Sequence, residues 1–289
     1  MQRHHHGRAV CWSILGLLAG ACAATSSGPG ASTSTPVAHQ GAEAPAAVQS
    51  CFLLYEIGVG EIRRRPSAAC RVRVSPQSTF KIPHALAALD AGVLEGPETT
   101  MTYDGSPVPF ASWRRDHNLA SAMANSVVWF FQRLARDLGP ARERAYLEKL
   151  PYGNADSSSG LTSFWLGESL LVSPEEQLRF LLRLYEGDLP VSPGAMAAVR
   201  RTLVQPPGVV VNAAGQHPFG GPWHAGTVVS AKTGSGDDRS GKQVRWLVGH
   251  VARAGRAWIF VSLVFGEPPL GPLAAVDFAA RALAEEGVL

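Results

Sequence analysis

The sequence predicts an α+β fold in which one antiparallel sheet is flanked by helices and accompanied by a helical lobe. Two observations carry this prediction: strand-like apolar runs lie near both ends of the chain, and helix-like patterns fill the middle. Separate groups of strands and helices are typical of α+β proteins. Of the 289 residues, 46% are apolar and 17% are charged. This composition suffices for a substantial core and excludes a disordered chain.

The N-terminal segment has the features of an export signal. Arg3 and Arg8 form a basic region, and an uncharged apolar run and small residues suitable for cleavage follow it. The apolar run, residues 9–19, is too short for a membrane-spanning helix, which needs about twenty apolar residues. We therefore expect residues 1–23 to be a signal peptide. Residues 18–22 resemble a lipobox, so plain secretion and a lipid anchor at Cys22 both stay open. In either case the protein is expected to be exported, to the periplasm or beyond the cell.

Residues 24–48 are predicted to be a flexible spacer before the folded domain. They are rich in Ser, Thr, Ala and Pro, and such a stretch cannot bury enough apolar area to offset its ordering entropy. Residues 49–289 are the candidate folded domain. The net charge of +3 is too small to predict a nucleic acid or an anionic membrane surface as a partner.

Cys51 and Cys70 are predicted to form a disulfide. A strand pattern at residues 52–57, a glycine turn and a second strand at residues 61–65 form a hairpin whose open end would bring the two cysteines together. An exported protein meets an oxidising compartment, which favours the bridge. Two buried free thiols are the alternative. No metal site is predicted, because the candidate cysteine and histidine ligands are not spaced as in known metal sites. These residues are Cys51, Cys70, His117, His217, His224 and His250.

The remaining elements follow from apolar periodicity and from capping residues. Ser173 and Pro174 have the residue types of an N-cap and a first helical position. Helices are predicted at residues 78–92, 121–138, 141–150, 174–185, 193–204 and 274–286. Strands are predicted at residues 227–232, 244–251 and 258–265. Glycine and polar turns separate these strands, as in an antiparallel meander.

Ser78 and Lys81 form the first candidate catalytic pair. They are three residues apart at the start of a predicted helix, which places both side chains on one face. A serine becomes a good nucleophile only when a base removes its proton. A lysine amine can serve as that base if burial lowers its pKa. Taken alone, this spacing occurs by chance in many long proteins.

Four further short motifs become informative through their order along the chain. Lys232 is expected to end a strand beside a cleft, where Gly234 would let a ligand approach the backbone closely. Each motif alone is equally typical of a core or a loop. The motifs are Ser126-Val127-Val128, Tyr152-Gly153-Asn154, Phe164-Trp165-Leu166 and Lys232-Thr233-Gly234.

The ordered series that begins with Ser78-Thr79-Phe80-Lys81 resembles that of the class D, OXA-type, serine beta-lactamases. The resemblance covers roughly residues 51–289. Val128 favours class D, since the other serine beta-lactamases and the penicillin-binding proteins usually carry an asparagine there. The resemblance implies a catalytic domain with the fold shared by these enzymes and the penicillin-binding proteins. It also implies a beta-lactam substrate, a monomer or a dimer, and no metal or cofactor.

The resemblance also implies a role for each site residue. Ser78 would attack the lactam, Ser126 would relay a proton to the lactam nitrogen, and Lys232 would bind the substrate carboxylate. Lys81 would react with CO₂ or bicarbonate to give N6-carboxylysine, the general base for acylation and deacylation, held by the indole N–H of Trp165. Apolar neighbours would favour the neutral amine that this reaction needs. The implied substrate-binding residues are Thr233, Gly234, Ser235, Val128, Leu166 and Trp113, of which Trp113 is equally typical of a core.

One departure from the family pattern affects substrate binding. Many class D enzymes carry an arginine shortly before the last helix, but residues 271–276 contain no basic side chain. Carboxylate binding would then depend on Lys232, Thr233 and Ser235, with Arg239 or Arg245 as candidate helpers. The main alternative function is a non-hydrolysing beta-lactam sensor or penicillin-binding protein that stays acylated. A non-enzymatic surface lipoprotein would leave the ordered motifs as a coincidence.

Overall fold

The computed structural model describes residues 48–66 and 68–289. Apart from Val48, the predicted signal peptide and spacer lie outside these residues, so export, cleavage and lipidation at Cys22 stay predictions. The described chain from residue 48 onwards belongs to a single compact unit.

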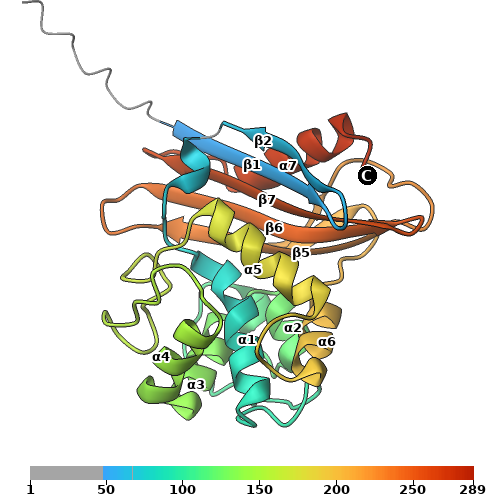
Figure 1. Cartoon of the computed structure of the whole chain (residues 1–289). Coiled ribbons are helices and arrows are strands. Elements are labelled where there is room, and N and C mark those ends of the chain that lie inside the picture. The colour runs from blue at the N-terminus through green and yellow to red at the C-terminus, as the bar shows by residue number, and fades with distance from the viewer. Residues whose placement is uncertain (1–47, 67) are drawn as a thin grey trace, which may run out of the picture. The chain divides into compact units, whose positions relative to one another are not determined.

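Five strands form one antiparallel sheet with the order β2-β1-β7-β6-β5 (Figure 1). The first strand of the described chain, β1, pairs with the last, β7, in the middle of the sheet, where Phe52 lies opposite Ser262. The predicted hairpin and the predicted meander therefore belong to one sheet, and the α+β prediction is confirmed. The strands are β1 (Val48–Glu56), β2 (Gly60–Arg65), β5 (Val228–Asp237), β6 (Gln243–Arg253) and β7 (Arg256–Gly266).

Helices cover both faces of this sheet. Figure 1 shows α1 to α6 gathered in a lobe on one side of the sheet and α7 on the other. The helices are α1 (Lys81–Asp90), α2 (Leu119–Ala124), α3 (Val128–Leu138), α4 (Pro140–Lys149), α5 (Pro174–Glu186), α6 (Pro193–Thr202) and α7 (Ala274–Glu285). As predicted, α5 begins with Ser173 as N-cap, in a capping box with Glu176, and with Pro174 in its first turn.

The predicted bounds of two helices were wrong, and both errors lie beside candidate catalytic residues. The helix expected at residues 121–138 is two helices, α2 and α3, because Ser126 has a φ of 55°, in the left-handed region that interrupts a helix. The helix expected at residues 78–92 begins with a 3₁₀ turn at Gln77–Phe80, and α1 starts only at Lys81.

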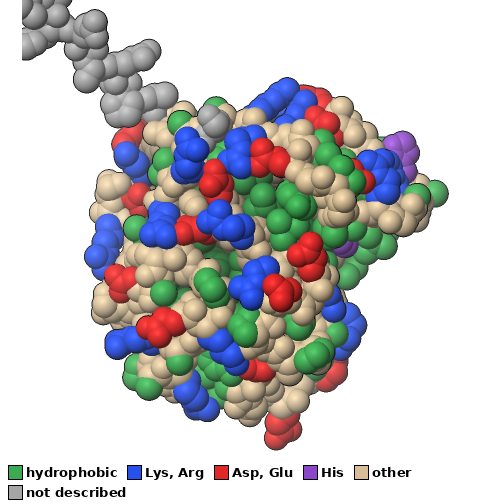
Figure 2. All heavy atoms as spheres, viewed as in Figure 1, with side chains coloured by type: hydrophobic (Ala, Val, Ile, Leu, Met, Phe, Trp, Pro, Cys, Tyr) green, Lys and Arg blue, Asp and Glu red, His purple; other side chains and the backbone are tan. Residues whose placement is uncertain are grey.

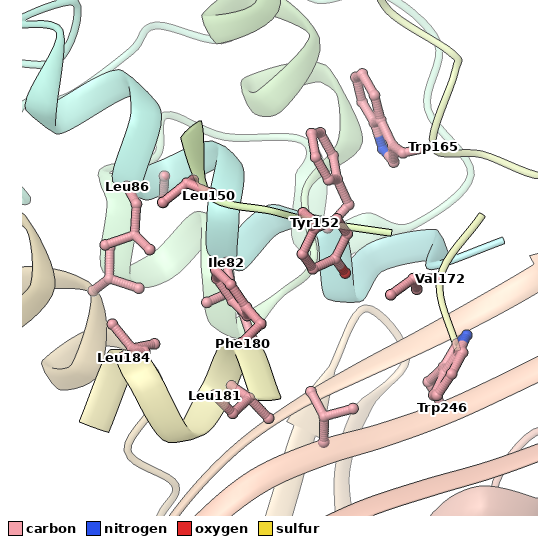
Figure 3. Packing of buried hydrophobic residues seen from close by; sticks show 14 of the residues in the cluster. Ile82, Leu86, Leu150, Tyr152, Trp165, Val172, Phe180, Leu181, Leu184 and Trp246 are labelled. Atoms are coloured by element: carbon pink, nitrogen blue, oxygen red, sulfur yellow. The ribbon is translucent and has the colours of Figure 1, made fainter. Parts of the chain in front are cut away.

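The core has two parts because the sheet is buried on both faces. Neighbouring residues of β1 point in opposite directions, so Leu53 packs with the helical lobe while Leu54 packs with α7. On the lobe side, Ile82 of α1 meets Phe180 and Leu181 of α5 (Figure 3). This packing fixes α1, which carries Lys81, against α5, and α5 in turn contacts β7 and β1 of the sheet.

The predicted disulfide between Cys51 and Cys70 is present, and both side chains are fully buried. It ties the short 3₁₀ turn Ala69–Arg71 to β1. The free thiol alternative is therefore wrong.

On the neighbouring edge strand β2, Arg63 pairs with Glu286 at 2.6 Å. Figure 2 shows positive and negative side chains interspersed over this face of the molecule.

A second, two-stranded sheet was not predicted. It consists of β3 (Val209–Asn212) and β4 (Gly215–Pro218). The hydroxyl of Ser112 donates a hydrogen bond of 2.9 Å to the carbonyl of Ala213 at the hairpin's turn. This bond fastens the hairpin to the segment that carries Trp113.

Candidate active site

Ser78 and Lys81 lie together because a 3₁₀ turn connects them. In such a turn residues three apart lie directly above one another, and the amine of Lys81 donates a hydrogen bond of 2.7 Å to the hydroxyl of Ser78. Lys81 has no exposed surface. Burial, and secondarily the charge of Lys232, hold the pKa of Lys81 well below its usual range. The amine that contacts the serine therefore favours its neutral form.

The surroundings of Lys81 are largely aromatic. Its nitrogen lies 5.4 Å from the centre of the Phe131 ring. The preceding residue, Phe80, packs on Trp165 with ring centres 5.4 Å apart. Trp165 is fully buried, and its indole N–H finds no hydrogen-bond partner among the described residues. A buried donor without an acceptor is costly, so an acceptor at this position would be stabilised.

Ser126 and Lys232 form a second lysine–serine pair. Ser126 lies in the short connection between α2 and α3, and its left-handed backbone is the strained conformation that replaces the predicted continuous helix. The amine of Lys232 on β5 donates to the hydroxyl of Ser126 and to the carbonyl of Thr233, both at 3.0 Å. Burial lowers the pKa of Lys232 to about 7. Near neutral pH this amine can therefore hold or release a proton.

The Lys-Thr-Gly motif lies inside a strand, and the prediction that Lys232 ends the strand was wrong. β5 continues to Asp237 because residues 234–237 remain paired with β6. Glycine is needed within this stretch: a Cβ on Gly234 would lie 2.9 Å from the carbonyl oxygen of Pro76. β5 thus packs directly on the turn that carries Ser78, which the small residue permits.

These elements surround a pocket of about 300 Å³, within the usual range for small-molecule sites. Its lining includes four hydroxyl residues, Ser78, Ser126, Thr233 and Ser235. It also includes the apolar residues Phe110, Trp113, Val128, Leu166, Trp246 and Val276. The pocket therefore combines several hydroxyl groups with a largely apolar surface.

The structure places the predicted site residues in two layers. Val128, Leu166, Thr233, Gly234, Ser235 and Trp113 all line the pocket. Trp113 is only 7% exposed, and its indole N–H donates to the carbonyl of Asn125 at 2.8 Å, so one ring serves both the pocket and the core. Lys81, Lys232 and Trp165 lie behind this lining and are nearly or fully buried.

The Tyr-Gly-Asn motif supports the loop around the site. Asn154 donates to the carbonyl of Ser169 and accepts from the N–H of Leu171, both at 2.9 Å. Gly153 has a φ of 59°, and a Cβ there would collide with the carbonyl of Leu171. Tyr152 is buried. The motif therefore holds together the two ends of the loop that carries Trp165.

The sequence analysis did not predict a buried histidine–glutamate pair that lies near Lys81. His84 lies three residues after Lys81 on α1, and its Nε2 is 3.2 Å from a carboxylate oxygen of Glu143 on α4. Both residues are only 1% exposed, and the His84 ring packs on Phe80, Phe131 and Trp165. Helical spacing from Lys81 is the signal that could have revealed it.

The two candidate arginines have different surroundings. Arg239 is exposed and pairs with Glu168 at 2.6 Å. Arg245 is only 8% exposed and lines the pocket.

Within residues 48–66 and 68–289, no group of three or more His, Cys, Asp or Glu residues could hold a metal ion. No helix in the described chain is long and apolar enough to cross a membrane.

The sequence of this chain is similar to that of several known proteins. Residues 50–282 match the family profile of the penicillin-binding protein transpeptidase domain. The probable beta-lactamase YbxI of Bacillus subtilis is 43% identical over 136 residues, which are 47% of this chain and 51% of that protein. The regulatory protein BlaR1 of Bacillus licheniformis is 30% identical over 216 residues, 75% of this chain and 33% of BlaR1. The chain thus spans about half the length of YbxI and a third of BlaR1.

Solved structures agree with the sequence relatives. The class D beta-lactamase BAT-2 superimposes with a TM-score of 0.72 at 30% identity, covering 84% of this chain and 93% of that one. The C-terminal domain of the Bacillus licheniformis BlaR penicillin receptor superimposes with a TM-score of 0.73 at 27% identity, covering 84% and 92%. The predicted resemblance to class D beta-lactamases is confirmed, and a receptor domain shares the same fold.

Proposed function

The chain belongs to the family of penicillin-binding protein transpeptidase domains, and from this premise we propose that it hydrolyses beta-lactams through an acyl-enzyme on Ser78. One observation carries the proposal most strongly. The amine of Lys81 is buried, favours its neutral form and contacts the Ser78 hydroxyl at 2.7 Å. A general base held against a serine is the arrangement that activates this nucleophile.

Acylation would use both lysine–serine pairs. The Ser78 oxygen attacks the lactam carbonyl as its proton passes to the base at Lys81. The backbone N–H groups of Ser78 and Ser235 would bind the oxyanion, and such a donor typically contributes about 3 kcal/mol. As the lactam C–N bond breaks, Ser126 passes a proton to the nitrogen. Lys232 supports that transfer, because its amine donates to the Ser126 hydroxyl at 3.0 Å.

Deacylation distinguishes an enzyme from a receptor that stays acylated. We propose that Lys81 carries a carbamate formed with CO₂, which supplies an anionic base for Ser78 and then for the hydrolytic water. The residues fit this group in two ways. Burial favours the neutral amine that reacts with CO₂, and the Trp165 N–H is a buried donor without a partner in the described chain. An anion in an apolar surrounding needs such a donor.

The carbamate is tested by removing and restoring bicarbonate. Steady-state turnover of a penicillin should fall in CO₂-depleted buffer and recover when bicarbonate is added. The Lys81→Ala variant should not respond and should either accumulate an acyl-enzyme, visible by mass spectrometry, or fail to acylate. Lys149→Ala, which changes an exposed lysine, is the control. Turnover of the wild type that is independent of bicarbonate, or unchanged in Lys81→Ala, would refute this base.

A beta-lactam receptor is the second candidate, favoured by the likeness to the BlaR receptor domain over 84% of this chain. A chromogenic cephalosporin separates the two functions. An enzyme gives turnover that continues past one equivalent, whereas a receptor gives a stoichiometric burst that stops. We favour the enzyme because the relatives with the higher sequence identities are named beta-lactamases.

Export is proposed from residues 1–23. The mature protein would be periplasmic or secreted, and lipid-anchored if Cys22 is modified. Mass spectrometry of the mature N-terminus distinguishes plain cleavage from a diacylglyceryl cysteine.

The proposed oligomeric state is a monomer or a dimer. Size-exclusion chromatography with light scattering decides between the two.

A further inference from the structure

Arg245 is a buried cation beside the pocket without an acidic partner in the described chain. It is 8% exposed and belongs to no ion pair that the described residues form within 4 Å. Its Nη1 donates to the carbonyls of Gly236 and Val244 at 3.1 and 3.0 Å. Its Nε is buried and lacks a partner among the described residues. A buried charge left without a counter-charge destabilises a fold, so this guanidinium is poised for an anion.

The register of the sheet places Arg245 next to the pocket's hydroxyl groups. Ser235 of β5 lies directly opposite Arg245 of β6. Directly opposed residues of an antiparallel pair share one face of the sheet, and Thr233, two residues before Ser235, shares that face as well. All three residues line the pocket. They bring two hydroxyl groups and one guanidinium to the same part of the pocket.

We propose that Arg245, with the hydroxyl groups of Thr233 and Ser235, binds the carboxylate of the beta-lactam substrate. This inference rests on the proposed function and assigns the cation that residues 271–276 do not supply. A guanidinium suits a carboxylate because its planar N–H groups match the two oxygens. The Nη2 group of Arg245 is the available donor, because Nη1 is engaged by the strand backbone and Nε is buried.

The other basic groups near the pocket are less suitable. Arg239 is neutralised by Glu168 at 2.6 Å and is exposed. The amine of Lys232 already donates to Ser126 and to Thr233, and its pKa of about 7 leaves it partly uncharged near neutral pH. Asp237, the acid whose charge acts on Arg245, forms no ion pair with it within 4 Å. The guanidinium keeps its charge at every accessible pH.

The test compares a penicillin with its methyl ester, which lacks the negative charge. In Arg245→Ala, kcat/KM for the acid should fall about 10- to 100-fold, mainly through KM, the loss expected for a hydrogen bond to a charged group. The value for the ester should hardly change. Arg245→Gln, which keeps a donor for the strand carbonyls, should behave like Arg245→Ala and guards against loss of folding. Arg253→Ala, at the other end of β6, is the control.

The outcomes separate this inference from the proposed function. An equal loss for acid and ester, or no loss for either, would mean that Arg245 only supports the strands and would overturn the inference. If the wild type acylates without turnover, the hydrolytic function fails, but the same comparison of acylation rate constants still tests Arg245. If the wild type does not acylate at all, both proposals are refuted.

Discussion

Burial, and secondarily the positive charge of Lys232, lower the pKa of Lys81, so one buried amine of the site acts on the other. Each amine donates to a different serine, Lys81 to Ser78 at 2.7 Å and Lys232 to Ser126 at 3.0 Å. Two like charges in an apolar surrounding repel, which favours at least one neutral amine. This coupling supports a division of labour in which one lysine serves the nucleophile and the other serves the departing nitrogen.

Burial of these amines should make stability depend on pH. The pKa of Lys232 is about 7 in the folded protein, against 10.5 for a lysine that is fully exposed to water. Between these values the unfolded chain binds more protons, so the free energy of unfolding should rise with pH, by up to about 1.4 kcal/mol per pH unit for each amine. Urea unfolding from pH 7.5 to 9 should show this rise. Lys232→Met should reduce the slope and exposed Lys149→Met should not; equal slopes in all three proteins would contradict the prediction.

Trp165→Phe should impair the base without destroying the site. The variant keeps an aromatic ring but loses the indole N–H that has no partner in the described residues. A hydrogen bond to a charged group contributes about 1.5–3 kcal/mol, so kcat should fall about 10- to 100-fold and higher bicarbonate should restore part of it. Trp258→Phe, which changes a buried indole in the core on the other face, controls for the loss of volume. Full activity of Trp165→Phe without added bicarbonate would exclude this role.

Gly234→Ala should push β5 away from the turn that carries Ser78. The added methyl group would lie 2.9 Å from the carbonyl oxygen of Pro76 and 3.2 Å from a methyl carbon of Thr79. Overpacking of this kind typically costs about 1–3 kcal/mol. Acylation measured by stopped flow should slow, and the melting temperature should drop. Gly96→Ala, where a Cβ meets nothing within 4 Å, should change neither quantity. A normal acylation rate in Gly234→Ala would show that the close approach is unnecessary.

Removal of the disulfide should affect stability but not chemistry. Cys51 and Cys70 are 19 residues apart, and closing a loop of this size contributes about 3 kcal/mol in the chain-entropy model. Cys51→Ala/Cys70→Ala should therefore melt at a lower temperature while keeping its kcat at 25 °C. Wild type treated with a reductant under mild denaturing conditions should melt like the double variant. An unchanged melting temperature would show that the bridge adds little.

Local patterns determined most of the fold. The apolar run of β1 and the meander of the last three strands predicted the sheet, and Ser173 with Pro174 predicted the start of α5 correctly. Two features of the site could not be predicted in this way. The break at Ser126 and the continuation of β5 beyond Lys232 both oppose the local pattern. Contacts made elsewhere in the fold hold the strained serine backbone and the glycine-containing end of the strand.

The sequence by itself determined the set of candidate reacting groups, because the order of short motifs is a property of the chain and does not depend on packing. Only the tertiary structure decided their states and partners. Whether a lysine is neutral depends on how much water its neighbours exclude. Phe131 reaches Lys81 from α3, and Trp165 packs on the neighbouring Phe80 from a distant loop. Likewise, strand register set Arg245 opposite Ser235 and left Arg239 with Glu168. Burial and register arise between segments, so no local pattern could have distinguished the two arginines.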